Sequence, residues 1–190
     1  NYIAYNNIYT NGTSQNHTYE SEACIDGSHN VPEIYRTYGI LSIFTSNTNI
    51  TNNNVNVTSG LTKVYNPYNE STNSIVGIDI YYDSNNNTVS NNNILISGND
   101  PFIYGTGVLG AQTGVGNTTA NNNKFTSNNI NLNGNYFTSG IITGYNSKNT
   151  TIANNNVTCN AKTYAYGVTL EISQANNVYN NNINTKAIAN

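Results

Sequence analysis

Charged side chains are scarce in this chain. Its 190 residues include 6 Lys+Arg and 9 Asp+Glu, and the formal net charge is −3. Proteins that bind nucleic acids neutralise phosphates with clustered Lys and Arg, and the sequence contains no such basic stripe. We therefore expect no nucleic-acid partner. With so few charged residues, the polar surface must consist mainly of Asn, Thr, Ser and Tyr.

Long apolar runs are also missing. No window approaches the ~18 consecutive apolar residues of a membrane-spanning helix, so we expect no membrane span. No signal peptide precedes Asn1 and the initiator Met is missing, which suggests a processed or excised chain. Low charge with abundant Asn can indicate a disordered, prion-like tract, but the regular apolar spacing described below argues against disorder.

Residue types that ligate metals are few and fall mainly in one stretch. His17 and His29, the only two histidines, lie there with Glu20, Glu22 and Asp26. Their spacing matches no known ligand motif. We therefore expect no metal site and no other cofactor.

What the chain does contain is a repeat. Val89 is followed five positions later by Ile94, an Asn stands immediately before Ile94, and Ile96 follows at alternating spacing. The distance between copies varies, so this is a repeat with loops of variable length. The same pair recurs as Ile3/Ile8, Ile50/Val55, Val89/Ile94, Phe125/Ile130, Ile152/Val157 and Val178/Ile183.

Each copy predicts short β-strands. The alternation of apolar residues has a period of two, and most of these residues are β-branched. Asn tolerates the left-handed conformation, so the Asn runs suit corners between strands. A third apolar element begins with Gly before each of the later copies, at 39–43, 77–80, 107–109, 140–142 and 167–170. Three short strands cannot bury a face alone, but stacked copies can.

The pattern predicts an all-β, right-handed parallel β-helix of about six coils with three short strands per coil. Two motifs recur: Tyr-Gly-Ile/Val at 38–40 and 166–168, and Asn-Asn-Asn followed by Val or Ile. Through these motifs the chain resembles the right-handed β-helix proteins of the pectate-lyase-like superfamily. Within it, the chain is similar to Asn-rich repeat modules of archaeal, especially methanogen, adhesin-like surface proteins. The motifs are specific for fold and weak for function, because β-helices host enzymes, adhesins and spacers alike.

We expect one domain over residues 1–190, with a long insertion at 11–38 and shorter loops at 61–76, 99–106 and 110–117. Binding residues are often carried by loops on a rigid scaffold. Aromatic and basic residues of the earlier loops therefore form a candidate binding face, made of Tyr19, Tyr35, Arg36, Tyr65, Tyr68, Phe102 and Tyr104.

Inside the coils we expect apolar stacks and a ladder of corner amides. The predicted core stacks are Ile50, Val89, Phe125, Ile152 and Val178, with Val55, Ile94, Ile130, Val157 and Ile183. The predicted ladder is Asn54, Asn93, Asn129, Asn156 and Asn182, with amides bonded from coil to coil. Replacing Asn93 or Asn129 by Ala should then leave a buried amide partner unsatisfied.

No catalytic residue is expected. Enzymes of the pectate-lyase-like type need clustered carboxylates with Arg or Lys nearby. Asp79, Asp83 and Glu171 are the carboxylates on coil strands, and the aligned neighbours of Asp79 are not acidic. We interpret Asp79 as a solvated, outward-facing residue.

The two cysteines are expected to be unpaired. Cys159 aligns with inward apolar positions, where a free thiol behaves as a small apolar residue. Cys24 lies three or four coils away, roughly 15–20 Å along the axis. A disulfide needs Cα atoms within about 7 Å, so it would require the insertion to fold down the side and Cys159 to face outward.

The sequence leads to two hypotheses about function. The first hypothesis is a non-enzymatic, extracellular or cell-surface module with a structural or adhesive role, which the family resemblance also implies. Its partners would be further copies of the chain, stacked head to tail into a filament, or cell-surface glycans and proteins. The alternative is a carbohydrate-binding or carbohydrate-active β-helix. Possible N-glycosylation sites are Asn11, Asn16, Asn49, Asn56, Asn69, Asn86, Asn117, Asn149 and Asn156.

Overall fold

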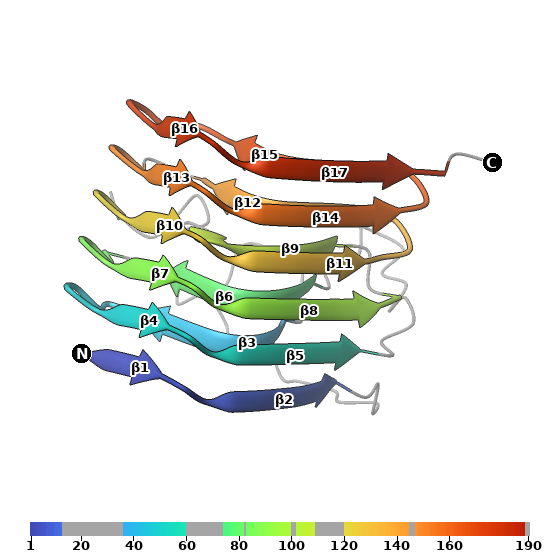
Figure 1. The fold of residues 1–190 in the computed structure, drawn as a ribbon, viewed down its shortest axis with the longest axis horizontal. Helices are drawn as coiled ribbons and strands as arrows, with labels where there is room; N and C mark the ends of the chain where they lie inside the picture. The colour runs from blue at the N-terminus through green and yellow to red at the C-terminus, as the bar shows by residue number, and fades with distance from the viewer. Residues whose placement is uncertain are drawn as a thin grey trace, which may run out of the picture.

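The computed structural model describes residues 1–12, 36–59, 74–81, 83–99, 102–108, 120–144 and 147–188. These residues form three parallel sheets (Figure 1). Sheet A contains β1 (Tyr2–Ala4), β4 (Asn49–Thr51), β7 (Thr88–Ser90), β10 (Lys124–Thr126), β13 (Thr151–Ala153) and β16 (Asn177–Tyr179). Sheet B contains β2 (Asn7–Gly12), β5 (Asn54–Ser59), β8 (Asn93–Gly98), β11 (Asn129–Asn133), β14 (Asn156–Ala161) and β17 (Asn182–Ala187). Sheet C contains β3 (Arg36–Ile43), β6 (Ser74–Tyr81), β9 (Phe102–Val108), β12 (Phe137–Thr143) and β15 (Tyr164–Leu170).

Successive strands of each sheet pair in register with their equivalents in the next coil. In sheet A, for example, Ile50 pairs with Val89 and Val89 pairs with Phe125. The chain passes from sheet C to sheet A to sheet B and then returns to sheet C one level higher (Figure 1). The strands of sheet B run to the right in front and those of sheet C to the left behind, so the coil is right-handed (Figure 1). The predicted parallel β-helix is confirmed.

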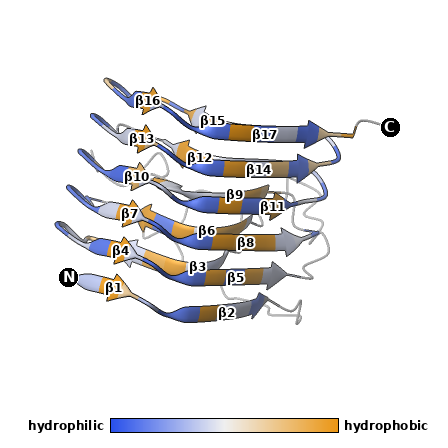
Figure 2. Cartoon of the chain, viewed as in Figure 1, coloured by the Kyte–Doolittle hydropathy of each residue, from blue (hydrophilic) through white to orange (hydrophobic). Residues whose placement is uncertain are grey.

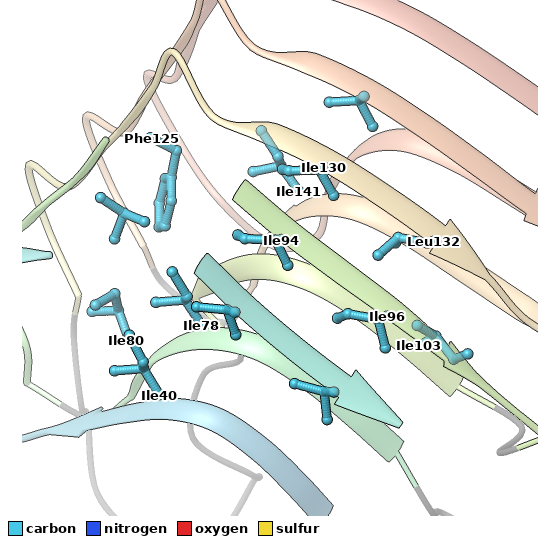
Figure 3. Close-up of a cluster of buried hydrophobic side chains, with 14 of the residues drawn as sticks. Ile40, Ile78, Ile80, Ile94, Ile96, Ile103, Phe125, Ile130, Leu132 and Ile141 are labelled. Atoms are coloured by element: carbon cyan, nitrogen blue, oxygen red, sulfur yellow. The ribbon is translucent and has the colours of Figure 1, made fainter. Parts of the chain in front are cut away.

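The interior is filled by apolar columns that run along the helix axis. Figure 3 shows isoleucines of sheets B and C meeting Phe125 of sheet A and Leu132 of sheet B in this space. Figure 2 shows apolar bands that continue from strand to strand along sheet B. Among the predicted core residues, Ile50, Val89, Phe125, Ile152, Val55, Ile94, Ile130 and Val157 are all buried.

Two predicted core residues are not buried. Val178 is 43% exposed and Ile183 is 44% exposed. Both occupy the inward columns, since Val178 pairs with Ile152 and Ile183 pairs with Val157. They belong to the last described coil, so no described coil lies over them. The sequence therefore predicted the correct inward column for both residues, but its prediction that they are buried is wrong.

Each strand of sheet C contains a glycine at which the register pairing between coils is interrupted. Ile75 and Ile78 both belong to the core although they are three residues apart, so the alternation is interrupted at Gly77. At the equivalent Gly105, a Cβ would lie 2.4 Å from the Gly140 carbonyl oxygen and 2.6 Å from Ile130 Cγ2. A side chain cannot fit there, because both the next coil and the opposite sheet occupy the space.

The predicted loops 11–38, 61–76 and 99–106 are too long. Strand β2 runs to Gly12, and sheet C strands begin before their glycines, at Arg36, Ser74 and Phe102. These leading residues carry no regular apolar alternation, so the sequence indicates a loop, whereas register pairing with neighbouring coils holds them in strands. The loop at 110–117 lies outside the described residues.

Candidate functional site

The corner between sheets A and B is built from a triplet of residues, usually three Asn. The first residue of the triplet takes the left-handed conformation, with φ of 56° at Asn52, 55° at Asn91 and 58° at Asn154. Asn adopts this conformation more readily than most residues, which explains why it dominates the corner. Tyr5 and Ser127 take the same position in two coils with φ of 58°.

The second residue of the triplet forms a buried amide ladder. This inner ladder consists of Asn6, Asn53, Asn92, Asn128, Asn155 and Asn181. At Asn128, Oδ1 accepts from the backbone N–H of Asn92 (3.0 Å) and from its Nδ2 (3.1 Å). Nδ2 of Asn128 donates to the Val89 carbonyl (2.9 Å) and to Asn155 Oδ1 (3.1 Å). The four middle amides, Asn53, Asn92, Asn128 and Asn155, are buried, and each joins three successive coils with its polar atoms satisfied.

The third residue of the triplet forms a second ladder on the outer surface. This outer ladder contains the residues predicted from the sequence: Asn129 Nδ2 donates to Asn93 Oδ1, and Asn156 Nδ2 donates to Asn129 Oδ1, both at 2.9 Å. The side chains are exposed, so the expectation of a buried ladder at Asn54, Asn93, Asn129, Asn156 and Asn182 is wrong. The physical reason is strand parity, because the alternation that buries Ile94 directs Asn93 outward.

Both ladders have a direction. In the inner ladder, the lower coil donates through its backbone N–H and Nδ2 to Oδ1 of the coil above, as Asn155 does to Asn181 at 3.0 and 2.9 Å. In the outer ladder the upper coil donates, as Asn182 Nδ2 does to Asn156 Oδ1 at 2.9 Å. The two ends of the rod are therefore chemically different from each other.

A shorter amide row supports the corner between sheets C and A. The backbone N–H of Thr48 donates to Asn87 Oδ1, and that of Asn87 donates to Asn123 Oδ1, both at 2.9 Å. Asn87 and Asn123 are buried, and each Nδ2 also donates to a carbonyl of a lower coil, of Thr45 and Ser84 respectively. The A–B and C–A corners thus both use amide side chains as bridges between coils.

A cluster of aromatic side chains covers part of the outer face of sheet C. We call it the aromatic strip; it consists of Phe102, Tyr104, Tyr136, Phe137, Tyr164 and Tyr166. Phe137 contacts rings of the coils below and above it, with centroid distances of 5.5 Å to Phe102 and 5.4 Å to Tyr166. The ring planes of Tyr164 and Tyr166 are nearly parallel, 7° apart.

The predicted binding face overlaps this strip only in part. Phe102 and Tyr104 belong to it, but they lie half-buried on strand β9 rather than on a loop. Arg36 is the first residue of β3, and its side chain is not described. Tyr19, Tyr35, Tyr65 and Tyr68 lie outside the described residues.

The sequence interpretation missed the other four members of the strip. Phe137 and Tyr164 pair in register with the Phe102 position, and Tyr166 continues the Tyr104 column. The available signal was position relative to the glycine inside each sheet C strand, since Phe102, Phe137 and Tyr164 each stand three residues before it. In β9 this glycine is Gly105, which is equivalent to Gly77 and Gly140. The sequence interpretation, which began this element at Gly107, was therefore out of register here.

Asp79 is fully buried, contrary to the prediction of a solvated residue. It lies on the outer face of sheet C, where Val76 and Ile142 are buried with Tyr38, Tyr81 and Tyr104 packed against them. That face is therefore packed rather than open to water near Asp79. Asp83 and Glu171 are exposed, and the described part of the chain contains no group of three or more His, Cys, Asp or Glu placed to hold a metal ion.

Cys159 is a free, buried thiol in the core. Burial raises its pKa to about 12, and hydrogen bonds with Thr138 and the Gly140 backbone only partly oppose this shift. The inward placement agrees with the interpretation of Cys159 as a small apolar residue. Cys24 lies outside the described residues.

Several sequons have accessible asparagines. Asn11, Asn49, Asn86, Asn149 and Asn156 are exposed and Asn56 is half-buried, whereas Asn16, Asn69 and Asn117 lie outside the described residues. Three of these amides also bond to amides of neighbouring coils, since Asn122 donates to Asn86, Asn149 donates to Asn122, and Asn156 donates to Asn129.

Comparison of the chain with protein-family models, with curated proteins and with solved structures finds no match in any of the three. Among the described residues, none forms a helix with the length and apolar character needed to cross a membrane.

Proposed function

We propose that the chain is a non-enzymatic structural module of an extracellular or cell-surface protein, and that copies of it stack head to tail. The observation that supports this proposal is the matched polarity of the two ends. The last described coil ends in ladder groups that have no partner above them, and the first coil begins with the groups that would pair with them. This holds for both the inner and the outer ladder.

The inner ladder gives the first half of this match. Asn181 is the uppermost inner-ladder residue, so its backbone N–H faces the position where a next coil would place an Asn Oδ1. Asn6 is the lowest, and its Oδ1 is the acceptor that a coil below would use. A second copy placed above Asn181 would bring Asn6 into the relation that Asn181 has with Asn155, with N–H···O of 3.0 Å.

The outer ladder has the opposite direction and matches as well. Asn182 Oδ1 would accept from Asn7 Nδ2 of the second copy, as Asn156 Oδ1 accepts from Asn182 at 2.9 Å. Val178 and Ile183 would be covered by the same contact. Because the two ends differ, the contact is heterologous and does not close, so it generates a filament.

The surface location is supported by the repeat motifs. Tyr-Gly-Ile/Val and Asn-Asn-Asn-Val/Ile are the features through which the chain resembles methanogen adhesin-like modules of the pectate-lyase-like superfamily. Exposed sequons and a polar surface with little charge are compatible with a glycosylated protein outside the cell. An adhesive role would need a binding face on the side of the rod, which the stacking contact leaves uncovered.

The decisive experiment is sedimentation velocity of the chain over a concentration series, with electron microscopy of the same samples. We expect assemblies that lengthen with concentration into rods of constant width. Substituting Ile183→Lys or Val178→Lys places a charge in the stacking contact, so each variant should stay monomeric.

A matched control is Leu95→Lys, which adds the same charge on an exposed side position of β8. This variant should assemble like the unmodified chain. Monomers at every concentration, or equal assembly of Ile183→Lys and the unmodified chain, would refute end-to-end stacking.

A further inference from the structure

The aromatic strip is the largest described cluster of rings on the side of the rod. Its upper part is accessible, since Tyr136, Tyr164 and Tyr166 are each 44% exposed. The other three rings, Phe102, Tyr104 and Phe137, are half-buried on strands β9 and β12, which limits their movement. Half-exposed aromatic rings on a rigid sheet are typical of recognition surfaces, because they offer large contact area at small cost in side-chain entropy.

The rings are spaced along the helix axis at the interval of the coils. Phe102, Phe137 and Tyr166 come from three successive strands of sheet C, and their neighbouring centroids are 5.5 and 5.4 Å apart. Tyr136 and Tyr164 repeat this step at 5.5 Å. A pyranose ring in an extended, equatorially linked glycan advances by roughly the same length as the ~4.8 Å between parallel strands. Successive sugar rings can therefore meet successive coils.

The chemistry of the strip selects among ligands. None of its six members is charged, and its tyrosines combine an apolar ring with a hydroxyl group that donates and accepts hydrogen bonds. Sugar rings present apolar C–H faces and neutral hydroxyl groups, which match this combination. A polyanion would need cationic partners that the strip does not contain.

We propose that the aromatic strip binds one neutral, extended polysaccharide chain that lies along the helix axis over strands β9, β12 and β15. The aromatic rings contact the apolar faces of consecutive sugars, and the phenol groups of Tyr164 and Tyr166 bond to sugar hydroxyls. This site is independent of the proposed end-to-end stacking, because it lies on the side of the rod.

The test is isothermal titration calorimetry with neutral oligosaccharides of two to six sugars from the cello, manno, xylo and chito series. We expect at least one series to bind, with affinity rising steeply up to the trisaccharide and little beyond it. Hexagalacturonate and the curved maltohexaose serve as charged and non-extended probes and should bind at least tenfold more weakly.

Variants connect the binding to the strip. Tyr164→Ala and Tyr166→Ala should each weaken binding about tenfold, equivalent to about 1.4 kcal/mol. Tyr164→Phe retains the ring and should retain most of the affinity. Tyr9→Ala removes an exposed tyrosine from sheet B and should change nothing. Unchanged melting temperatures would show that the variants are folded.

Three outcomes would overturn the proposal. The first is that no neutral series binds at millimolar concentration, and the second is that Tyr164→Ala and Tyr166→Ala bind as the unmodified chain does. The third is side-by-side self-association that these variants abolish without any oligosaccharide binding, which would assign the strip to a second copy instead. None of the three depends on stacking, since Ile183→Lys can be titrated as a monomer.

Discussion

The inner ladder makes a quantitative prediction about stability. Replacing Asn128 by Ala removes four side-chain hydrogen bonds: two from Asn92, one to the Val89 carbonyl and one to Asn155 Oδ1. At about 1 kcal/mol net for each bond, the free energy of unfolding should fall by about 4 kcal/mol. For a chain of this size that corresponds to a melting temperature lower by about 8–16 °C.

The neighbouring Asn129 provides the matched control. Its side chain makes two ladder bonds of the same 2.9 Å length, to Asn93 and from Asn156, but both lie on the exposed surface. Water replaces exposed bonds at little cost, so Asn129→Ala should lower the free energy of unfolding by no more than about 1 kcal/mol. Both variants also keep the backbone N–H that Asn128 donates to Asn155.

The assay is chemical and thermal denaturation of the two variants and the unmodified chain, followed by far-ultraviolet circular dichroism. A large loss for Asn128→Ala with a small loss for Asn129→Ala supports the assignment of the buried ladder to the second residue of each triplet. Equal losses, or a larger loss for Asn129→Ala, would refute the reasoning from burial.

Two further predictions test the glycine of a sheet C strand and the buried thiol of the core. Gly105→Ala should abolish folding or cost several kcal/mol, because its Cβ meets a backbone carbonyl oxygen at 2.4 Å. Gly134→Ala should cost less, because its Cβ meets only side-chain atoms, Thr138 Cγ2 at 2.7 Å and Ile103 Cδ1 at 3.1 Å. Soluble yield and melting temperature distinguish the two variants. Cys159 has its pKa raised to about 12 from 9.0, so the folded chain holds the thiol proton more tightly than the unfolded chain. Stability should therefore decline as pH rises from about 9 to about 12, and Cys159→Ala should lessen that decline in urea titrations; an identical pH profile would contradict the burial argument.

The coils of sheets A and B could be predicted from the sequence because their burial follows a local rule. Alternation at Val55-x-Val57 and Ile94-x-Ile96 identifies the inward face directly. The same rule, applied one residue earlier, would have placed Asn93 on the outer face. What it does not indicate is that Asn92 turns its amide inward, because that orientation depends on the left-handed φ at Asn91.

Sheet C was harder to predict because its outer face is packed as well as its inner face. Asp79 is buried on this face, which becomes packed only when coils stack, since its buried apolar residues Val76 and Ile142 come from different coils. The aromatic strip also forms across coils, since Phe102 lies on β9 and Tyr166 lies on β15, two coils later in the sequence. Local periodicity does not encode such contacts; the register between coils does.

The two proposals concern different surfaces, and this separation has a consequence for binding. End-to-end stacking uses the end coils, whereas the aromatic strip lies on the side of sheet C, so each copy in a filament would present its own strip. A site that contacts only about three sugars binds weakly by itself, because few atoms are buried. Strips repeated along a filament would engage one long glycan or many at once, and avidity can then exceed the single-site affinity by about 10²–10⁴. The unmodified chain should therefore bind insoluble polysaccharide far more tightly than Ile183→Lys does, although both bind a soluble trisaccharide equally.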